Sequence, residues 1–273
     1  MSAANSIRSV LILALLGIAA FPLYWMVVTS LTPSSDMFAD TPNLLPSFSR
    51  FAVYLHALYE TNLLLWLKNS LIVALGTTVL SIALAILPAY TLSRLSFRGK
   101  IVFGLGLFIT QMLPEAMLVV PLYSIFTKLS LLNSLWGLVL ANTAFTVPVV
   151  TWILKGAVDG IPYEIEEAAR MDGANRLRIV AIIIVPLIAP TLAAASVIAF
   201  FHGWNEYLFA QTFISDEQLR VASVGLASYV GELSTPIDTV MAVGFMYTVP
   251  AVIFYLFAQR YVVSGMTAGG VKG

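Results

Sequence analysis

Ionisable and hydrogen-bonding side chains interrupt long apolar segments at two places in this 273-residue sequence. Glu115 lies between two prolines in QMLPEAMLVVPLY, and His202, Asn205 and Glu206 interrupt the stretch FFHGWNEYLFAQTF. A charge in apolar surroundings is costly unless it is paired or faces water. Two interpretations of Glu115 therefore stay open: it lines the path of a solute, or it holds two helices together by a hydrogen bond.

Hydrogen-bonding side chains near these interruptions suit the recognition of hydroxyl groups. The candidates for a solute path are Gln111, Glu115, Trp204, Asn205 and Glu206. We expect no metal site, because His56, the other histidine, lies far from His202 in the sequence and the chain has no cysteine.

Charged residues are concentrated in EIEEAARMDGANRLR, residues 164–178, directly before the apolar run IVAIIIVP. Pro162 suits the first turn of a helix, and the three glutamates that follow would lie where the helix dipole favours carboxylates. Gly173 is a natural helix stop. The segment therefore predicts a short helix, a glycine turn and a second helix that leads into the apolar run.

One face of the short helix is expected to carry Ile165, Ala168, Ala169 and Asp172, where the two alanines would let another backbone approach closely. Charged residues beside a membrane helix also form solvated caps. The segment is thus either a solvated boundary or a docking element.

No catalytic constellation is recognisable. The patterns H-E-x-x-H and G-x-S-x-G are absent, and the Gly99-Lys100 pair has Arg94 where a phosphate-binding loop needs its first glycine. We therefore expect no enzymatic activity in this chain, and any ATP would be bound by another chain.

Composition indicates a membrane protein, since 59% of the residues are hydrophobic and 10% are charged. A bilayer core of about 30 Å needs about 20 apolar helical residues. Six such runs predict an all-α membrane protein with six transmembrane helices in a single domain, residues 1–273. The runs are Ser9 to Leu31, Asn69 to Leu92, Ile101 to Phe126, Leu135 to Leu154, Ile179 to Phe201 and Thr239 to Ala258.

Basic residues predict the orientation. With a cytoplasmic N-terminus, ten lysines and arginines lie on the inner side and four on the outer side, as the positive-inside rule requires. Both termini and residues 164–178 are then cytoplasmic.

One spaced motif resembles a known signature. Glu167-Ala168-Ala169, three residues, Gly173, nine residues, Ile183, one residue and Val185-Pro186 are similar to the E-A-A-x-x-x-G-x9-I-x-L-P motif of membrane subunits of bacterial ABC importers. Val185 replaces the usual leucine, which exchanges one apolar residue for another.

Other segments resemble the carbohydrate-uptake branch of that family, especially its maltose-type second permease subunit. They are NSLIVALGTT, PLYSIFTKLSLLNSLWGLVL, IPYEIEEAARMDGA, WNEYLFAQTF and the ending GMTAGGVKG. The resemblance implies the type I ABC importer permease fold, with a cytoplasmic coupling loop at residues 159–178 and a cytoplasmic tail at residues 263–273.

The resemblance also implies a function and partners. The chain would translocate a sugar, a di- or oligosaccharide, across the bacterial inner membrane by alternating access. Its partners would be membrane lipid, a second homologous permease chain, an extracytoplasmic substrate-binding protein and a cytoplasmic ATPase dimer that binds ATP and magnesium; this chain would hold no cofactor and bind no nucleic acid.

The same resemblance assigns two contacts with the ATPase. The first involves Glu164, Glu167, Ala168, Ala169, Asp172 and Gly173, and the second, in the tail, involves Thr267, Gly269, Gly270 and Lys272.

Other functions stay open at this point. An ABC permease could carry a polyol or a glycerol-phosphate-type solute, and an ion-coupled secondary transporter could use Glu115 and Glu206 as proton or cation sites. A purely structural membrane scaffold is a third alternative. Co-purification with an ATPase would distinguish the ABC permease from the secondary transporter.

Overall fold

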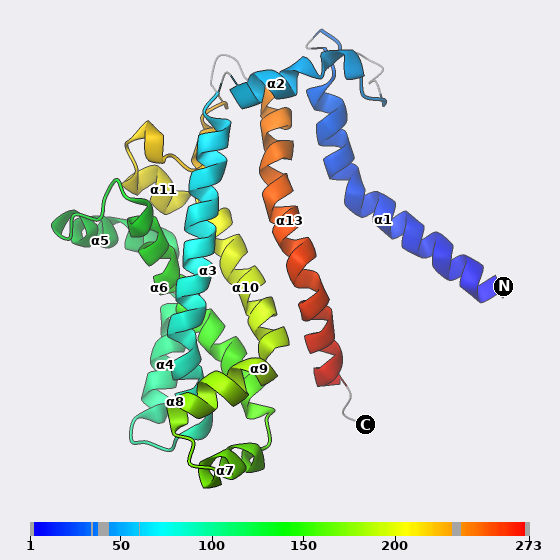
Figure 1. The fold of residues 1–273 in the computed structure, drawn as a ribbon. Helices are drawn as coiled ribbons and strands as arrows, with labels where there is room; N and C mark the ends of the chain where they lie inside the picture. The colour runs from blue at the N-terminus through cyan, green and yellow to red at the C-terminus, as the bar shows by residue number, and fades with distance from the viewer. Residues whose placement is uncertain (1–2, 34, 38–43, 60, 231–235, 271–273) are drawn as a thin grey trace. The chain divides into compact units, whose positions relative to one another are not determined.

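A computed structural model describes residues 3–33, 35–37, 44–59, 61–230 and 236–270, with residues 3, 4, 6 and 261–270 described by their backbone only. The described part of the chain consists of helices and their connections and contains no strand (Figure 1). The predicted all-α class is therefore confirmed for these residues. The contacts divide the chain into two units, Met1–Leu67 with Gly225–Pro250, and Lys68–Val224 with Ala251–Gly273.

The first unit contains α1 (Ala3–Ser30), the short helices η1 (Phe48–Arg50) and α2 (Ala52–Tyr59), and the first part of α13 (Ile237–Gly270). Its small core brings together Leu31, Tyr54 and Ala242. By contrast, α1 carries an 18-residue apolar window of which no residue is buried within the chain. This helix must therefore be covered by lipid or by another protein chain.

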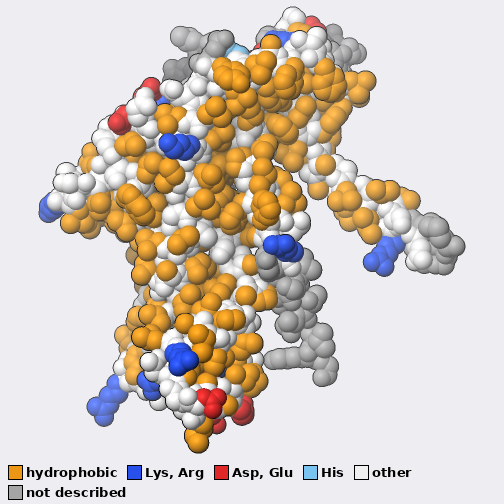
Figure 2. All heavy atoms as spheres, viewed as in Figure 1, with side chains coloured by type: hydrophobic (Ala, Val, Ile, Leu, Met, Phe, Trp, Pro, Cys, Tyr) orange, Lys and Arg blue, Asp and Glu red, His pale blue; other side chains and the backbone are white. Residues whose placement is uncertain are grey.

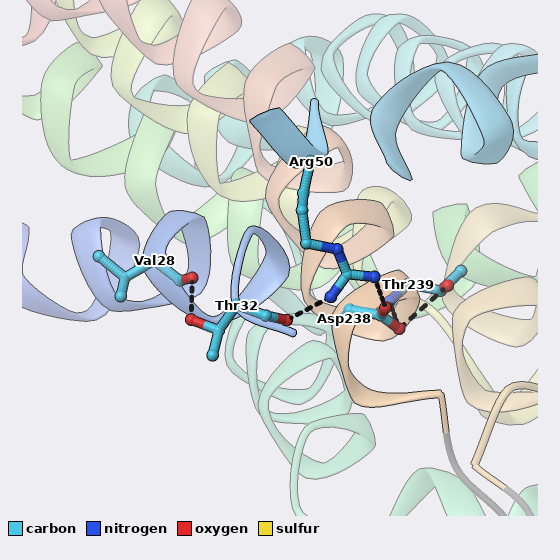
Figure 3. A network of polar contacts seen from close by, with 5 residues as sticks. All are labelled: Val28, Thr32, Arg50, Asp238 and Thr239. Carbon is cyan, nitrogen blue, oxygen red and sulfur yellow. Dashed lines mark hydrogen bonds and ion pairs between the residues drawn. The ribbon is translucent and has the colours of Figure 1, made fainter. Parts of the chain in front are cut away.

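A polar network joins three segments of the first unit that are far apart in sequence (Figure 3). The Arg50 guanidinium donates hydrogen bonds to the Thr32 carbonyl at 2.8 Å and to Asp238 Oδ2 at 3.1 Å. Asp238 also accepts the Thr239 backbone N–H at 2.7 Å, and the Thr32 hydroxyl donates to the Val28 carbonyl at 2.8 Å. Arg50 thus connects the segment after α1 to the start of α13.

The second unit contains most of α3 (Leu63–Arg94) and the helices between it and α12 (Ala222–Ala227). Within it α6 (Leu135–Asp159) packs against α10 (Ala189–Trp204). Gly203 lets α10 approach α3 closely, because a Cβ there would lie 3.0 Å from the Ala74 Cα. The ring of Phe254 stacks on Phe200 with centroids 3.8 Å apart, which adds the second part of α13 to this core.

Among the described residues, four helices are long and apolar enough to cross a membrane, and two pairs of bent helices bring the possible number to six. The predicted third span, Ile101 to Phe126, is wrong as one continuous helix. It consists of α4 (Lys100–Thr110) and α5 (Glu115–Lys128), which are bent by 100°. Pro114 explains the break, since a proline disfavours helical geometry in the residue before it and has no N–H to donate.

The predicted fifth span, Ile179 to Phe201, is also not one straight helix. The segments Arg176–Leu187 and Ala189–Phe213 are bent by 82°. The first comprises α8 (Arg176–Ile179), a π-helical stretch (Val180–Ile184) and α9 (Val185–Leu187), and the second comprises α10 and α11 (Leu208–Phe213). Pro186 and Pro190 flank the bend, and each removes a backbone donor from the helical ladder.

Charged side chains gather at one end of the second unit. Figure 2 shows acidic and basic side chains near the position of α7 (Tyr163–Met171), whereas hydrophobic side chains cover most of the helical surface above it. This segregation is typical of a helical bundle whose sides face lipid and whose end faces water.

Candidate functional site

The charged segment folds as predicted, as helix, glycine turn and helix. Pro162 is the N-cap residue of α7 and not part of its first turn. Gly173 has φ +82°, a left-handed conformation that glycine adopts without a steric penalty. The Gly173 N–H donates to the Arg170 carbonyl at 3.0 Å, and the Ala174 N–H to the Ala169 carbonyl at 2.9 Å. Asn175 then caps α8, accepting the Arg178 N–H at 2.9 Å.

A buried carboxylate fastens α7 to the end of α3. The Glu166 side chain is 0% exposed, and it accepts hydrogen bonds from the Tyr90 hydroxyl at 2.8 Å and from Arg94 Nε at 2.5 Å. Arg94 also donates to the Ile161 carbonyl at 2.6 Å, while Arg170 lies 3.8 Å from Glu166. A charge-assisted pair of this kind, enclosed on most sides, holds α7 in a defined position against α3.

Sequence reasoning missed this role of Glu166, because it grouped all three glutamates as dipole-stabilising acids. A usable signal was present. Tyr90 and Arg94 are four residues apart and therefore share a face at the end of α3. An arginine at the end of an apolar helix, followed by a short acidic helix further along the chain, is a reasonable pair to test for a contact.

A second polar contact supports the same end of the unit. Asp159, the last residue of α6, accepts hydrogen bonds from the Ser93 hydroxyl and from Lys155 Nζ, both at 2.6 Å. The ends of α3 and α6 are thereby tied together just before the chain enters α7. Asp159 is exposed, so this contact contributes less than the buried pair.

The two faces of α7 differ from the expected arrangement. Ala169 is buried in a cluster with Val158, Ile161 and Ile179, whereas Ala168 is exposed. The prediction that both alanines share one face is therefore wrong, because adjacent helical residues are about 100° apart. The exposed face carries Glu164, Ile165, Glu167, Ala168, Met171 and Asp172.

Arg170 lies at the edge between these faces. Its guanidinium is 4.9 Å from the centroid of the Tyr163 ring, within the range of a cation–π interaction. Its hydrogen-bonding contact with the Tyr163 side chain raises the pKa of Arg170 above its already high value, so this residue is cationic at every physiological pH.

The helix breaks form a second candidate site. A cavity of about 350 Å³ is lined by Glu115, His202, Asn205, Glu206, Tyr207 and Leu208. Three of the five expected path residues, Glu115, Asn205 and Glu206, therefore meet in one place. The other two do not line it: Gln111 donates to the Phe145 carbonyl at 3.0 Å, and Trp204 is buried against Phe200.

The two glutamates of this cavity have different surroundings. Glu206 caps α11, accepting the backbone N–H groups of Phe209 at 2.5 Å and Ala210 at 2.9 Å. Glu115 lies in the first turn of α5, and its Oε1 is 3.8 Å from His202 Nε2, which is longer than a hydrogen bond. Glu115 therefore makes no hydrogen bond to His202, and its carboxylate oxygens can accept hydrogen bonds from another group.

Two further predictions concern metal binding and the end of the chain. Within the described residues no group of three or more metal-ligating side chains could hold an ion. The backbone of α13 is helical through Gly270, and this helix includes Thr267, Gly269 and Gly270, whereas Lys272 lies outside the described residues.

Comparison with known proteins identifies the family. Residues 81–268 match the family of binding-protein-dependent transport system inner membrane components. The chain belongs to this family. The match spans the segment from within α3 to near the end of α13, so it includes α7 and the helix breaks.

Two relatives match along nearly their whole length. The permease protein SmoH of a sulfoquinovosyl glycerol transport system, from Agrobacterium fabrum, is 36% identical over 93% of this chain and 89% of its own. The permease protein MalG of a trehalose/maltose transport system, from Thermococcus litoralis, is also 36% identical, over 94% of this chain and 92% of its own.

The fold is similar to that of a solved transporter. One chain of a bacterial ABC transporter involved in the import of the acidic polysaccharide alginate superposes with a TM-score of 0.80 at 25% identity, covering 96% of this chain and 98% of that chain. The resemblance based on Glu167, Gly173 and Pro186 is therefore confirmed at the level of the family and the fold.

The buried pair generates a testable prediction. Glu166→Ala leaves Arg94 and Tyr90 without their acceptor, so it should destabilise the protein by about 3 kcal/mol and lower the midpoint of thermal unfolding. Glu164→Ala, on the exposed face of the same helix, should leave the midpoint nearly unchanged. Equal midpoints for the two variants would contradict an anchoring role for Glu166.

Proposed function

We propose that this chain is the membrane subunit of a sugar importer and that α7 transmits the movement of a separate ATPase to the membrane helices. Both relatives described above are named for the transport of glycosides or disaccharides, and the structural neighbour imports a polysaccharide. The substrate proposed here is a di- or oligosaccharide. A polyol or a glycerol-phosphate-type solute is the alternative within the same family.

One observation carries the mechanism: α7 has an exposed face for a partner and a buried carboxylate that ties it to α3. When ATP binding closes an ATPase dimer, a helix docked on the ATPase moves with it. The bonds from Arg94 and Tyr90 to Glu166 would pass this movement to α3 instead of letting α7 swing freely. The membrane helices would then alternate between inward-open and outward-open states.

The exposed face of α7 suits such docking. We assign Glu164, Glu167 and Asp172 to polar contacts with the ATPase, and the small side chain of Ala168 to close packing beside them. Ala169 supports the helix from its inner side, and Gly173 forms the turn. The tail from Thr267 to Gly273 is proposed as a second contact.

Partners would complete the importer around this chain. We propose an ATPase dimer with bound ATP and magnesium at the cytoplasmic end, a binding protein at the outer end and a second permease chain. The unburied apolar surface of α1 supports contact with lipid or with that second permease. Family membership leaves no support for an ion-coupled secondary transporter or a scaffold.

The cavity at the helix breaks is proposed as part of the sugar path. Glu115 and Glu206 provide acceptors for hydroxyl groups, Asn205 provides an amide, and the Tyr207 ring provides a flat surface. None of the residues that line this cavity is a lysine or arginine, so its chemistry favours an uncharged sugar over an acidic one.

The glycine turn can be tested by changing one side chain. Gly173→Val places a branched residue at φ +82° and costs about 1–2 kcal/mol, so we expect normal membrane insertion but roughly tenfold less sugar transported per ATP hydrolysed. Gly173→Asn is the matched control, because asparagine tolerates left-handed geometry. Equal coupling in the two variants would contradict a requirement for this turn.

The orientation can be tested by labelling, since the chain has no cysteine of its own. Met171→Cys, on the exposed face of α7, should react with a membrane-impermeant maleimide only from the cytoplasmic side. Leu129→Cys, after the end of α5, should react only from the outside. Labelling of position 171 in intact cells would refute the proposed topology.

The path can be tested at Glu115. Loss of a hydrogen bond to a charged group costs about 1.5–3 kcal/mol, so Glu115→Ala should lower uptake of an uncharged disaccharide at limiting concentration by about tenfold or more. Glu217→Ala, an exposed glutamate in η3 (Glu217–Leu219), serves as the control. The path assignment fails if both variants transport at the same rate in proteoliposomes.

A further inference from the structure

Three arginines from three helices surround one cavity of about 480 Å³ next to α7. Arg94 comes from the end of α3, Arg170 from α7 and Arg176 from α8. The rest of the lining consists of Tyr90, Thr91, Leu95, Ser96, Phe97 and Tyr163. All of these residues belong to the second unit, and the family match does not by itself assign a ligand to them.

Positive charge in this cavity exceeds the negative charge that faces it. Glu166 is the neighbouring carboxylate, and its close ion pair is with Arg94 at 2.5 Å. Arg170 lies farther from the same carboxylate, at 3.8 Å, and Arg176 forms no ion pair with any residue that the structure describes. Asp159 also interacts with Arg94, but its charge is balanced by Lys155 at 2.6 Å. Glu166 is therefore the carboxylate left to balance three guanidinium groups, which leaves an excess of about two positive charges.

The hydrogen-bonding groups of the cavity define which anion it would favour. Guanidinium groups match the oxygens of a phosphate in pairs and bind it more strongly than they bind a neutral acceptor. The hydroxyl groups of Thr91 and Ser96 add short donors on the side of α3 and the turn that follows it. The volume exceeds what an isolated phosphate needs, and Leu95 and Phe97 provide an apolar edge for a larger molecule.

We propose that this cavity binds a phosphoryl group, carried either by the headgroup of an acidic phospholipid or by a free phosphate compound. The lipid source depends on the proposed orientation, because the end of α3 then lies at the level of the cytoplasmic headgroups, where anionic lipids attract basic residues. The site itself does not depend on which sugar is transported.

A bound phosphoryl group would bridge three elements that move together in the proposed mechanism. Contacts with Arg94, Arg170 and Arg176 would join α3, α7 and α8 across the glycine turn. Occupancy should therefore stabilise the closed packing of α7 and slow its local opening, without changing the exposed face that meets the ATPase.

The experiment measures hydrogen exchange of residues 163–178 in the complete importer, reconstituted in nanodiscs. One arm compares inorganic phosphate with chloride at equal ionic strength in zwitterionic phosphatidylcholine. The other arm replaces part of the phosphatidylcholine by phosphatidylglycerol without added phosphate. At ten times the dissociation constant, a ligand that binds the closed state should slow exchange by about tenfold.

Two arginine variants make the result specific. Arg176→Gln should abolish the protection, whereas Arg178→Gln, two residues further along and outside the cavity lining, should keep it. Protection by phosphate identifies a free anion as a ligand, and protection by phosphatidylglycerol alone identifies the lipid. The proposal is overturned if neither protects, or if Arg176→Gln responds as strongly as Arg178→Gln.

If neither ligand protects the assembled importer, the cavity does not bind a phosphoryl group and the proposal fails. A failure of this kind is distinguishable from failure of the proposed function. In that case sugar transport and its dependence on Gly173 would persist while the phosphate response is absent.

Discussion

The ion pair between Arg94 and Glu166 is the contact on which the proposed transmission of force depends. Without it, α7 would be held mainly by Ala169 and its apolar neighbours. Apolar contacts keep two helices together, but they are non-directional and do not fix the orientation of α7 relative to α3. Hydrogen bonds from Arg94 and Tyr90 to the carboxylate oxygens fix both the distance and the rotation of α7 relative to α3. Burying the Glu166 carboxylate costs free energy, and this cost is best explained by the defined position of α7 against α3 that the carboxylate imposes.

Local signals predicted local structure well. Pro162, the glutamates after it and Gly173 each have a preferred place in a helix or turn, so the sequence indicated α7 and its turn correctly. The position of Glu166 depends on Tyr90 and Arg94, which lie more than seventy residues earlier in the sequence. A local sequence pattern cannot indicate a contact between residues so far apart. For the same reason the division of Ala168 and Ala169 between two faces became visible only when the neighbours of α7 were known.

The helix breaks show a different limit of sequence reasoning. Long apolar runs indicated the four helices that are long and apolar enough to span a membrane, but they concealed bends of 100° and 82° in the third and fifth runs, because hydropathy is insensitive to backbone direction. Pro114, Pro186 and Pro190 were the available signals, yet Pro88 and Pro148 lie inside continuous helices. Whether a proline breaks a helix depends on how its surroundings satisfy the freed carbonyl. The breaks in turn bring Glu115 beside His202 and Glu206, which straight helices would not necessarily do.

The exposed apolar surface of α1 also affects how the cell must make this protein. A helix that buries none of its 18-residue apolar window within its own chain gains the packing of that window only from lipid or another chain. A copy synthesised in excess of its partner would present this helix to the membrane as an unassembled surface, available to quality-control proteases. Balanced synthesis of the subunits would therefore matter for the survival of this chain as well as for the activity of the importer.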